Sequence, residues 1–183
     1  MQQNVIDILE KYIRGKDQNQ SAILEEIYTK NAKVLFDIKV DTIVFPAEIV
    51  GSVNIANTLS RDFNKRHDYV KTYYLTDQSK QFCADNIRDQ QWLVIMRDKQ
   101  TGEIKIGTGI YDWYFSERQG GCLAVAEHKI TIAVMLSLPS QCIDLLNVLQ
   151  QNLPYPWVET QQVITTLKEY SYLDDLSLYI ASH

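Results

Sequence analysis

The sequence predicts an α+β domain, in which a curved antiparallel sheet wraps over N-terminal helices and a helical extension follows. Three observations lead to this prediction. Apolar residues recur at helical spacing in the first third of the chain, and the period becomes that of β-strands from about residue 69 to residue 138. Helical spacing returns after Pro139. Because helices and strands are segregated, the strands are expected to form an antiparallel meander covered on one face by helices.

Two amphipathic helices and a short strand are expected at the start of the chain. Residues 4–15 and 21–28 each place apolar side chains on one face at helical spacing. Gly15 marks the end of the first helix, and Asn19 or Ser21 caps the second. The apolar run at residues 34–36 then indicates a strand.

A third helix precedes the main run of strands. Residues 39–50 are expected to be irregular, because Pro46 excludes a central strand there. Gly51 and Ser52 open the helix, and Phe63 belongs to its inward face. The strands that follow are predicted at residues 69–76, 92–97, 104–115 and 123–138, with turn residues between the last three.

The last part of the chain is predicted to be helical and apolar. Ser140 caps a helix that the Pro154-Tyr155-Pro156 segment ends, and residues 157–180 form one long or two short helices. We therefore expect one domain over residues 1–138, with residues 139–183 as a helical extension packed on it.

Composition and charge exclude several classes of function. The 183 residues include 18 Lys and Arg against 23 Asp and Glu, a net charge of −5, which argues against nucleic acid and anionic membranes as partners. No apolar run is long enough to cross a membrane, and no signal peptide is expected. Cys83, Cys122 and Cys142 are widely spaced and odd in number, which indicates buried free thiols in a cytoplasmic protein.

Three segments give the chain a resemblance to a known superfamily. They are residues 12–17 (YIRGKD), residues 51–56 (GSVNIA), and residues 109–115 (GIYDWYF) leading to Glu127-His128-Lys129-Ile130. In this order they resemble the nuclear transport factor 2-like superfamily, which includes ketosteroid isomerase and the SnoaL-type polyketide cyclases. The resemblance covers about residues 4–138.

The resemblance implies a cone-shaped, cystatin-like fold with a pocket at the open end. It also implies a homodimer formed through the sheet, a small apolar organic ligand and no cofactor. The general base of the isomerases aligns with Phe36, and Asp37 lies one residue away, on the opposite face of a regular strand. Isomerase chemistry by that route is therefore not expected.

Strand alternation indicates one candidate for proton transfer. His128 lies on an otherwise apolar strand face. A symmetric hairpin around the turn at residues 119–120 pairs residues whose numbers sum to about 238, which sets Ile110 opposite His128 and Asp112 diagonal to it. Asp112 would then orient the imidazole of His128 as a general base, and Tyr114 would donate to an oxyanion. A one-residue change in register would separate these residues.

The remaining candidates are apolar. Phe36, Phe63, Ile110 and Ala126 are expected to line the pocket. The alternate face of the 104–115 strand carries aromatic residues that are expected to hold a dimer, namely Tyr111, Trp113 and Phe115.

Two functions remain open from the sequence. The first is a small-molecule-binding domain, which acts as a cofactor-free isomerase, cyclase or dehydratase if it is an enzyme. The alternative is a non-catalytic binding or assembly module whose pocket is filled. No metal site is expected, because His67, His128 and His183 lie far apart and no helix carries histidines four residues apart.

Overall fold

A computed structural model describes residues 2–77, 86–118 and 120–183, with side chains from Val5 onward. The first elements are α1 (Gln2–Asp17), α2 (Ser21–Ile27), β1 (Tyr28–Ile38) and β2 (Glu48–Val50). A helical segment follows that runs through α3 (Ser52–Ala56), a π-helical stretch η1 (Asn57–Asp62) and α4 (Phe63–Arg66). The long strands are β3 (His67–Thr76), β4 (Asn86–Asp98), β5 (Ile104–Glu117) and β6 (Leu123–Leu138). The C-terminal part contains η2 (Ser140–Cys142), α5 (Ile143–Asn152), β7 (Trp157–Glu159), α6 (Thr160–Leu167), η3 (Ser171–Leu173) and α7 (Asp174–Ala181).

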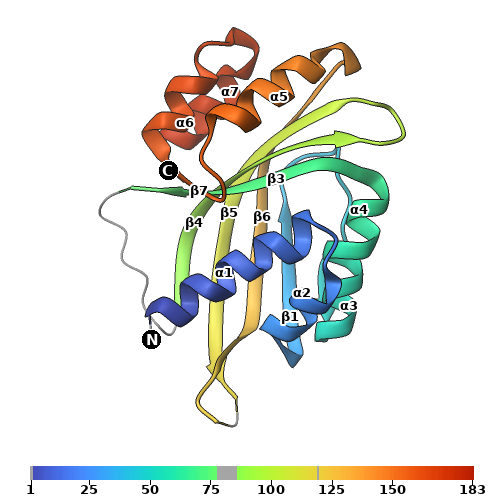
Figure 1. Cartoon of the computed structure of the whole chain (residues 1–183), viewed down its shortest axis with the longest axis vertical. Helices are drawn as coiled ribbons and strands as arrows, with labels where there is room; N and C mark the ends of the chain where they lie inside the picture. The colour runs from blue at the N-terminus through green and yellow to red at the C-terminus, as the bar shows by residue number, and fades with distance from the viewer. Residues whose placement is uncertain (1, 78–85, 119) are drawn as a thin grey trace.

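The described strands form one seven-stranded sheet in the order β2-β1-β6-β5-β4-β3-β7. Neighbours pair antiparallel except β1 with β6 and β3 with β7, which pair parallel. Figure 1 shows the sheet bending over α1, α2, α3 and α4, with α5, α6 and α7 gathered as a separate group. The predicted fold class, α+β with a curved sheet over N-terminal helices and a helical extension, is confirmed.

The central part of β4 is buried on both faces, which explains why Trp92–Met96 is a continuous apolar run. Trp92, Val94 and Met96 point to an inner core against the N-terminal helices. Leu93 and Ile95 point to an outer core, which Leu146, Leu149, Leu176 and other residues of the C-terminal helices complete. The extension thus covers the outer face of β3, β4 and β5 rather than leaving it to solvent.

Three local predictions are corrected. Residues 157–159 form strand β7 at the sheet edge rather than the start of a helix, because they pair with Tyr74–Thr76 of β3. The first strand extends over Tyr28–Ile38, because its pairing with β6 continues well beyond the apolar run at 34–36. Tyr28 therefore begins this strand instead of ending the second helix.

The cysteine prediction is also corrected. Cys122 is exposed in the turn between β5 and β6, and Cys142 is half-buried. Cys83 lies outside the described residues. No described helix is both long enough and apolar enough to pass through a bilayer.

Candidate ligand-binding site

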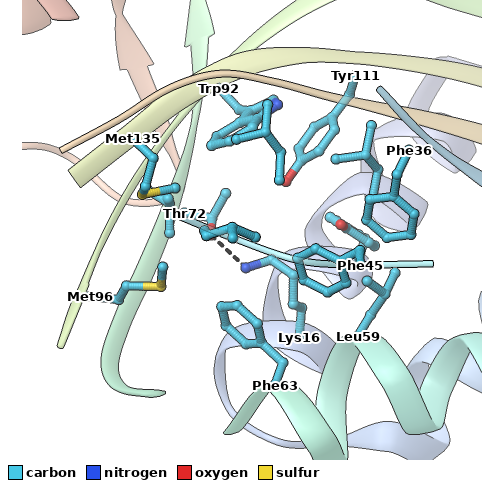
Figure 2. A pocket seen from close by; sticks show the side chains of 15 residues that line it. Lys16, Phe36, Phe45, Leu59, Phe63, Thr72, Trp92, Met96, Tyr111 and Met135 are labelled. Atoms are coloured by element: carbon cyan, nitrogen blue, oxygen red, sulfur yellow. Dashed lines mark hydrogen bonds between the residues drawn. The ribbon is translucent and has the colours of Figure 1, made fainter. Parts of the chain in front are cut away.

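An apolar cavity of about 50 Å³ lies between the concave face of the sheet and the N-terminal helices. Figure 2 shows Trp92 and Tyr111 on one side of it and Leu59, Phe45 and Phe63 on the other, with the Tyr111 hydroxyl pointing inward. The residues that line it are Tyr12, Lys16, Phe36, Ile43, Phe45, Leu59, Phe63, Thr72, Trp92, Val94, Met96, Tyr111, Ile130, Ile132 and Met135. Of these residues only Lys16 carries a charge.

Lys16 brings an ammonium group to this apolar wall. It lies in the last turn of α1 and is 6% exposed. Its Nζ donates to Oδ1 of Asp17 at 2.6 Å and to Oγ1 of Thr72 at 2.7 Å, and lies 4.9 Å from the centre of the Phe63 ring. An ammonium carries three protons, and these two bonds use two of them. The third proton has no acceptor among the described residues, and Lys16 lines the cavity.

Asp17 holds the lysine in place and ties together distant parts of the chain. Its Oδ2 accepts from the backbone N–H of Thr72 at 2.6 Å and from the Tyr155 hydroxyl at 3.1 Å, and its Oδ1 also accepts from the Thr72 hydroxyl at 3.0 Å. The end of α1, strand β3 and the segment before β7 therefore meet at one carboxylate. Such extensive hydrogen bonding is what a buried charge pair needs to offset its loss of hydration.

A larger groove of about 440 Å³ adjoins the cavity. Ile43, Phe45 and Phe63 line both, so these side chains separate the groove from the cavity. Phe45 stacks on Phe36 with ring centres 4.6 Å apart. The other residues of the groove are Thr42, Val44, Pro46, Thr58, Asp62, Arg66, His67, Asp98 and Lys105.

His67 is the imidazole that faces this groove. Its Nδ1 lies 3.2 Å from the carbonyl oxygen of Phe63, and its ring packs on the Phe63 ring at 4.6 Å. Because a carbonyl only accepts, Nδ1 carries the proton and Nε2 is left as an acceptor. Burial lowers the pKa of His67 below its ordinary value, which favours the neutral ring at pH 7.

His128 does not reach the cavity. Its side chain is 0% exposed, and its ring stacks on Trp113 with centres 3.5 Å apart. Nδ1 shares a 2.8 Å hydrogen bond with the Tyr28 hydroxyl, and Nε2 has no partner among the described residues. Burial lowers the pKa of His128 well below its ordinary value. The imidazole is therefore a neutral core group, sealed between aromatic rings.

The predicted grouping of Asp112 and Tyr114 with His128 is wrong, because the hairpin has a different register. Asp112 pairs with Lys129 and Trp113 with His128, so the residue numbers sum to 241 instead of 238. A shift by an odd number exchanges the two faces of the strand. Asp112 instead accepts from the backbone N–H of Asp89 at 2.9 Å, at the irregularity in β4.

The same shift moves the predicted dimer face to the interior. Tyr111 and Trp113 are buried in the inner core, and Phe115 packs against it. These aromatic residues are not a dimer surface. Of the predicted pocket residues, Phe36 and Phe63 line the cavity, whereas Ile110 and Ala126 are half-buried and line neither cavity nor groove.

The sequence reasoning missed Lys16, Thr72, His67 and Lys105 as site residues. Lys16 and Asp17 were visible as two charges at the end of an amphipathic helix, within the segment that carries the family resemblance. His67 follows Lys65 and Arg66, a short basic run that by itself indicates only a solvated helix end. Nothing local indicates that Thr72 and Lys105 reach the same region.

Comparison with known proteins identifies the fold. No model of a known family and no curated protein matches the sequence significantly. A nuclear transport factor 2-like superfamily protein from Salmonella enterica serovar Typhimurium matches the structure with a TM-score of 0.57 and 9% identity, over 75% of this chain and 90% of that one. A ketosteroid isomerase-like protein from Erwinia carotovora atroseptica matches with a TM-score of 0.55 and 11% identity, over 73% of this chain and 96% of that one.

A third solved structure comes from a named enzyme of the same fold. Hexachlorocyclohexane dehydrochlorinase LinA-type3 from Novosphingobium barchaimii matches with a TM-score of 0.55 and 12% identity, over 73% of this chain and 87% of that one. The chain therefore has the nuclear transport factor 2-like fold, which the sequence resemblance predicted.

Proposed function

We propose that this chain is a small-molecule-binding domain that holds a mostly apolar organic molecule between the groove and the inner cavity. The observation that carries the proposal is the buried ammonium of Lys16, which borders an otherwise apolar cavity and keeps one proton free. A ligand oxygen that accepts this proton would be fixed in position, while the aromatic walls bind the apolar remainder.

The sizes of the two spaces indicate how a ligand would fit. Small-molecule sites usually measure about 300–1,000 Å³, so the 440 Å³ groove is large enough and the 50 Å³ cavity is not. Phe45 belongs to the irregular segment between β1 and β2. Rotation of its side chain away from Phe36 would join the two spaces, and we expect the ligand to take the place of this ring.

A more specific version of this proposal is that the domain catalyses proton transfer on the molecule it binds. The fold is shared with a dehydrochlorinase and a ketosteroid isomerase-like protein. His67 is the candidate base, since its ring faces the groove with Nε2 available. A general test is the base-promoted ring opening of 5-nitrobenzisoxazole, in which the base takes the C3 proton and the N–O bond breaks. Activity that His67→Asn removes and His183→Asn leaves intact would support the assignment; a wild-type rate no faster than buffer would contradict it.

Binding itself is tested with a neutral fluorescent probe. N-phenyl-1-naphthylamine brightens in apolar surroundings, and we expect saturable binding of one molecule per chain. Val94→Phe places a larger side chain in the cavity wall and should weaken binding at least about tenfold, because overfilling leaves no room for the ligand. Val148→Phe, on the exposed face of α5, is the matched control and should bind normally. No saturable binding, or equal binding by Val94→Phe, would contradict the proposal.

A second candidate function, that of a scaffold, is favoured by the small volume of the inner cavity. A hollow of about 50 Å³ is close to filled, as expected for a scaffold that binds no small molecule. The same titration separates the two, because a scaffold would show no saturable uptake of the probe.

A further inference from the structure

We infer that the ligand is an organic acid, with an apolar body and an anionic head that binds Lys105 and Arg66 in the groove. This inference rests on the proposed function, because it names the ligand class of the same site. It goes further in assigning a second polar contact, at the outer end of the ligand, opposite the one that Lys16 makes in the cavity.

Lys105 is a buried cation that forms no ion pair with a described residue, although the Asp98 carboxylate of the same groove interacts with it at longer range. It is 8% exposed and lies on β5 directly across from Met96, which lines the inner cavity. Its one hydrogen bond among the described residues is a long one, from Nζ to the Ser137 hydroxyl at 3.4 Å, and it forms no ion pair there. Burying an ammonium costs free energy unless it is paired with an anion. An anionic group bound in the groove would therefore stabilise the buried charge of Lys105.

The two carboxylates of the groove already have partners, whereas its second cation, Arg66, has no ion-pair partner among the described residues. Arg66 lines the groove, is exposed and forms no ion pair with a described residue. Asp62 is paired with Lys65 at 2.8 Å. Asp98 accepts from the backbone N–H groups of Gln100 at 2.8 Å and Thr101 at 3.0 Å, and these bonds hold its pKa below the ordinary value.

The groove thus holds two cations that form no ion pair with a described residue, while Asp62 is paired with Lys65 and Asp98 accepts two backbone hydrogen bonds. An anionic ligand that binds in the groove would pair with these two cations, in a chain whose net charge is otherwise −5. Phe45, Phe63 and Ile43 form the apolar part of the same wall. A molecule with an acidic head and an apolar body matches both parts, whereas a neutral molecule uses only one.

The test compares two probes that share one aromatic body. 8-Anilinonaphthalene-1-sulfonate carries a sulfonate, and N-phenyl-1-naphthylamine does not. Because hydrogen bonds to charged groups contribute about 10- to 100-fold in affinity, the sulfonate should bind at least about tenfold more tightly. Lys105→Met keeps the unbranched apolar stem of the side chain. It should lower the affinity for the sulfonate probe about tenfold and change the affinity for the neutral probe less than about twofold.

The controls distinguish this site from general charge effects. Lys129→Met removes the same charge from the half-exposed side chain that lies 3.8 Å from Asp37, outside the groove, and should change neither probe. Arg66→Gln, at an exposed position, should weaken binding of the sulfonate probe severalfold. It takes the place of Lys105→Met in the test if that variant does not fold. Raising the salt concentration should weaken binding of the sulfonate probe and leave the affinity for the neutral probe unchanged.

Each outcome decides a different claim. If neither probe binds, the proposed function fails and the inference fails with it. If the neutral probe binds as tightly as the sulfonate, or if Lys105→Met and Arg66→Gln leave sulfonate affinity unchanged, the anionic ligand class is overturned while apolar binding stands.

Discussion

Acidification is expected to destabilise this protein through the buried imidazole of His128. The ring is enclosed by aromatic side chains, and burial lowers its pKa well below the ordinary value. In the unfolded chain the same residue titrates near pH 6.5. Between these two pKa values the unfolded state binds the proton and the folded state does not. The free energy of unfolding therefore falls as the pH drops below about 6.5.

The size of the effect follows from this linkage. Each pH unit below the unfolded pKa costs up to about 1.4 kcal/mol, and the loss is limited by how far the folded pKa lies beneath it. Because burial holds the pKa of His128 well below its ordinary value, moving from pH 7.5 to pH 5 removes up to about 2 kcal/mol through His128 alone. That is a large part of the 5–15 kcal/mol by which folded domains are usually stable.

The assay is urea unfolding of the wild type and His128→Asn at both pH values. The asparagine variant loses packing at every pH, and this constant loss cancels when each protein is compared with itself. The wild type should lose more than the variant, by up to about 2 kcal/mol. Tyr28→Phe removes the hydrogen bond at Nδ1 but keeps the imidazole, and should retain a pH dependence similar to that of the wild type. Equal losses in wild type and His128→Asn would refute the reasoning.

Three further predictions concern stability and are measured by urea or thermal unfolding. Lys16→Met leaves the Asp17 carboxylate buried without its cation and should cost about 3–5 kcal/mol; a loss under about 1 kcal/mol would mean that the pair is not buried. Leu146→Ala, in the outer core, should cost about 2–5 kcal/mol within a single transition, and a separate early transition would show that the C-terminal helices fold independently. Gly109→Ala drives a Cβ into the Thr131 carbonyl oxygen and should cost at least about 1–3 kcal/mol, so an unchanged midpoint would contradict the close approach.

The order of helices and strands was predictable because it depends on local periodicity. A strand buried on one side alternates, and a helix repeats every three to four residues, whatever the rest of the chain does. The change of period after residue 69 therefore located β3 to β6 correctly in outline. Burial on both faces is why Trp92–Met96 is apolar throughout.

The register between β5 and β6 was not predictable in the same way. The symmetric hairpin set Ile110 opposite His128, but the structure pairs Trp113 with it. The pairing shifts between Tyr114 and Phe115, and such irregularities insert residues without leaving a signature in the alternation. A change of register by an odd number of residues was sufficient to exchange the predicted catalytic face and the predicted dimer face.

The periodic pattern of the chain determined its fold class, because each element's buried face is recorded in consecutive residues. The candidate site depended on packing instead. Lys16, Thr72 and Tyr155 meet around Asp17 although up to 138 residues separate them along the chain. Which charged groups are enclosed, and which remain free for a ligand, follows from the way α1, β3 and the C-terminal segment close around one another, and no short stretch of sequence contains that information.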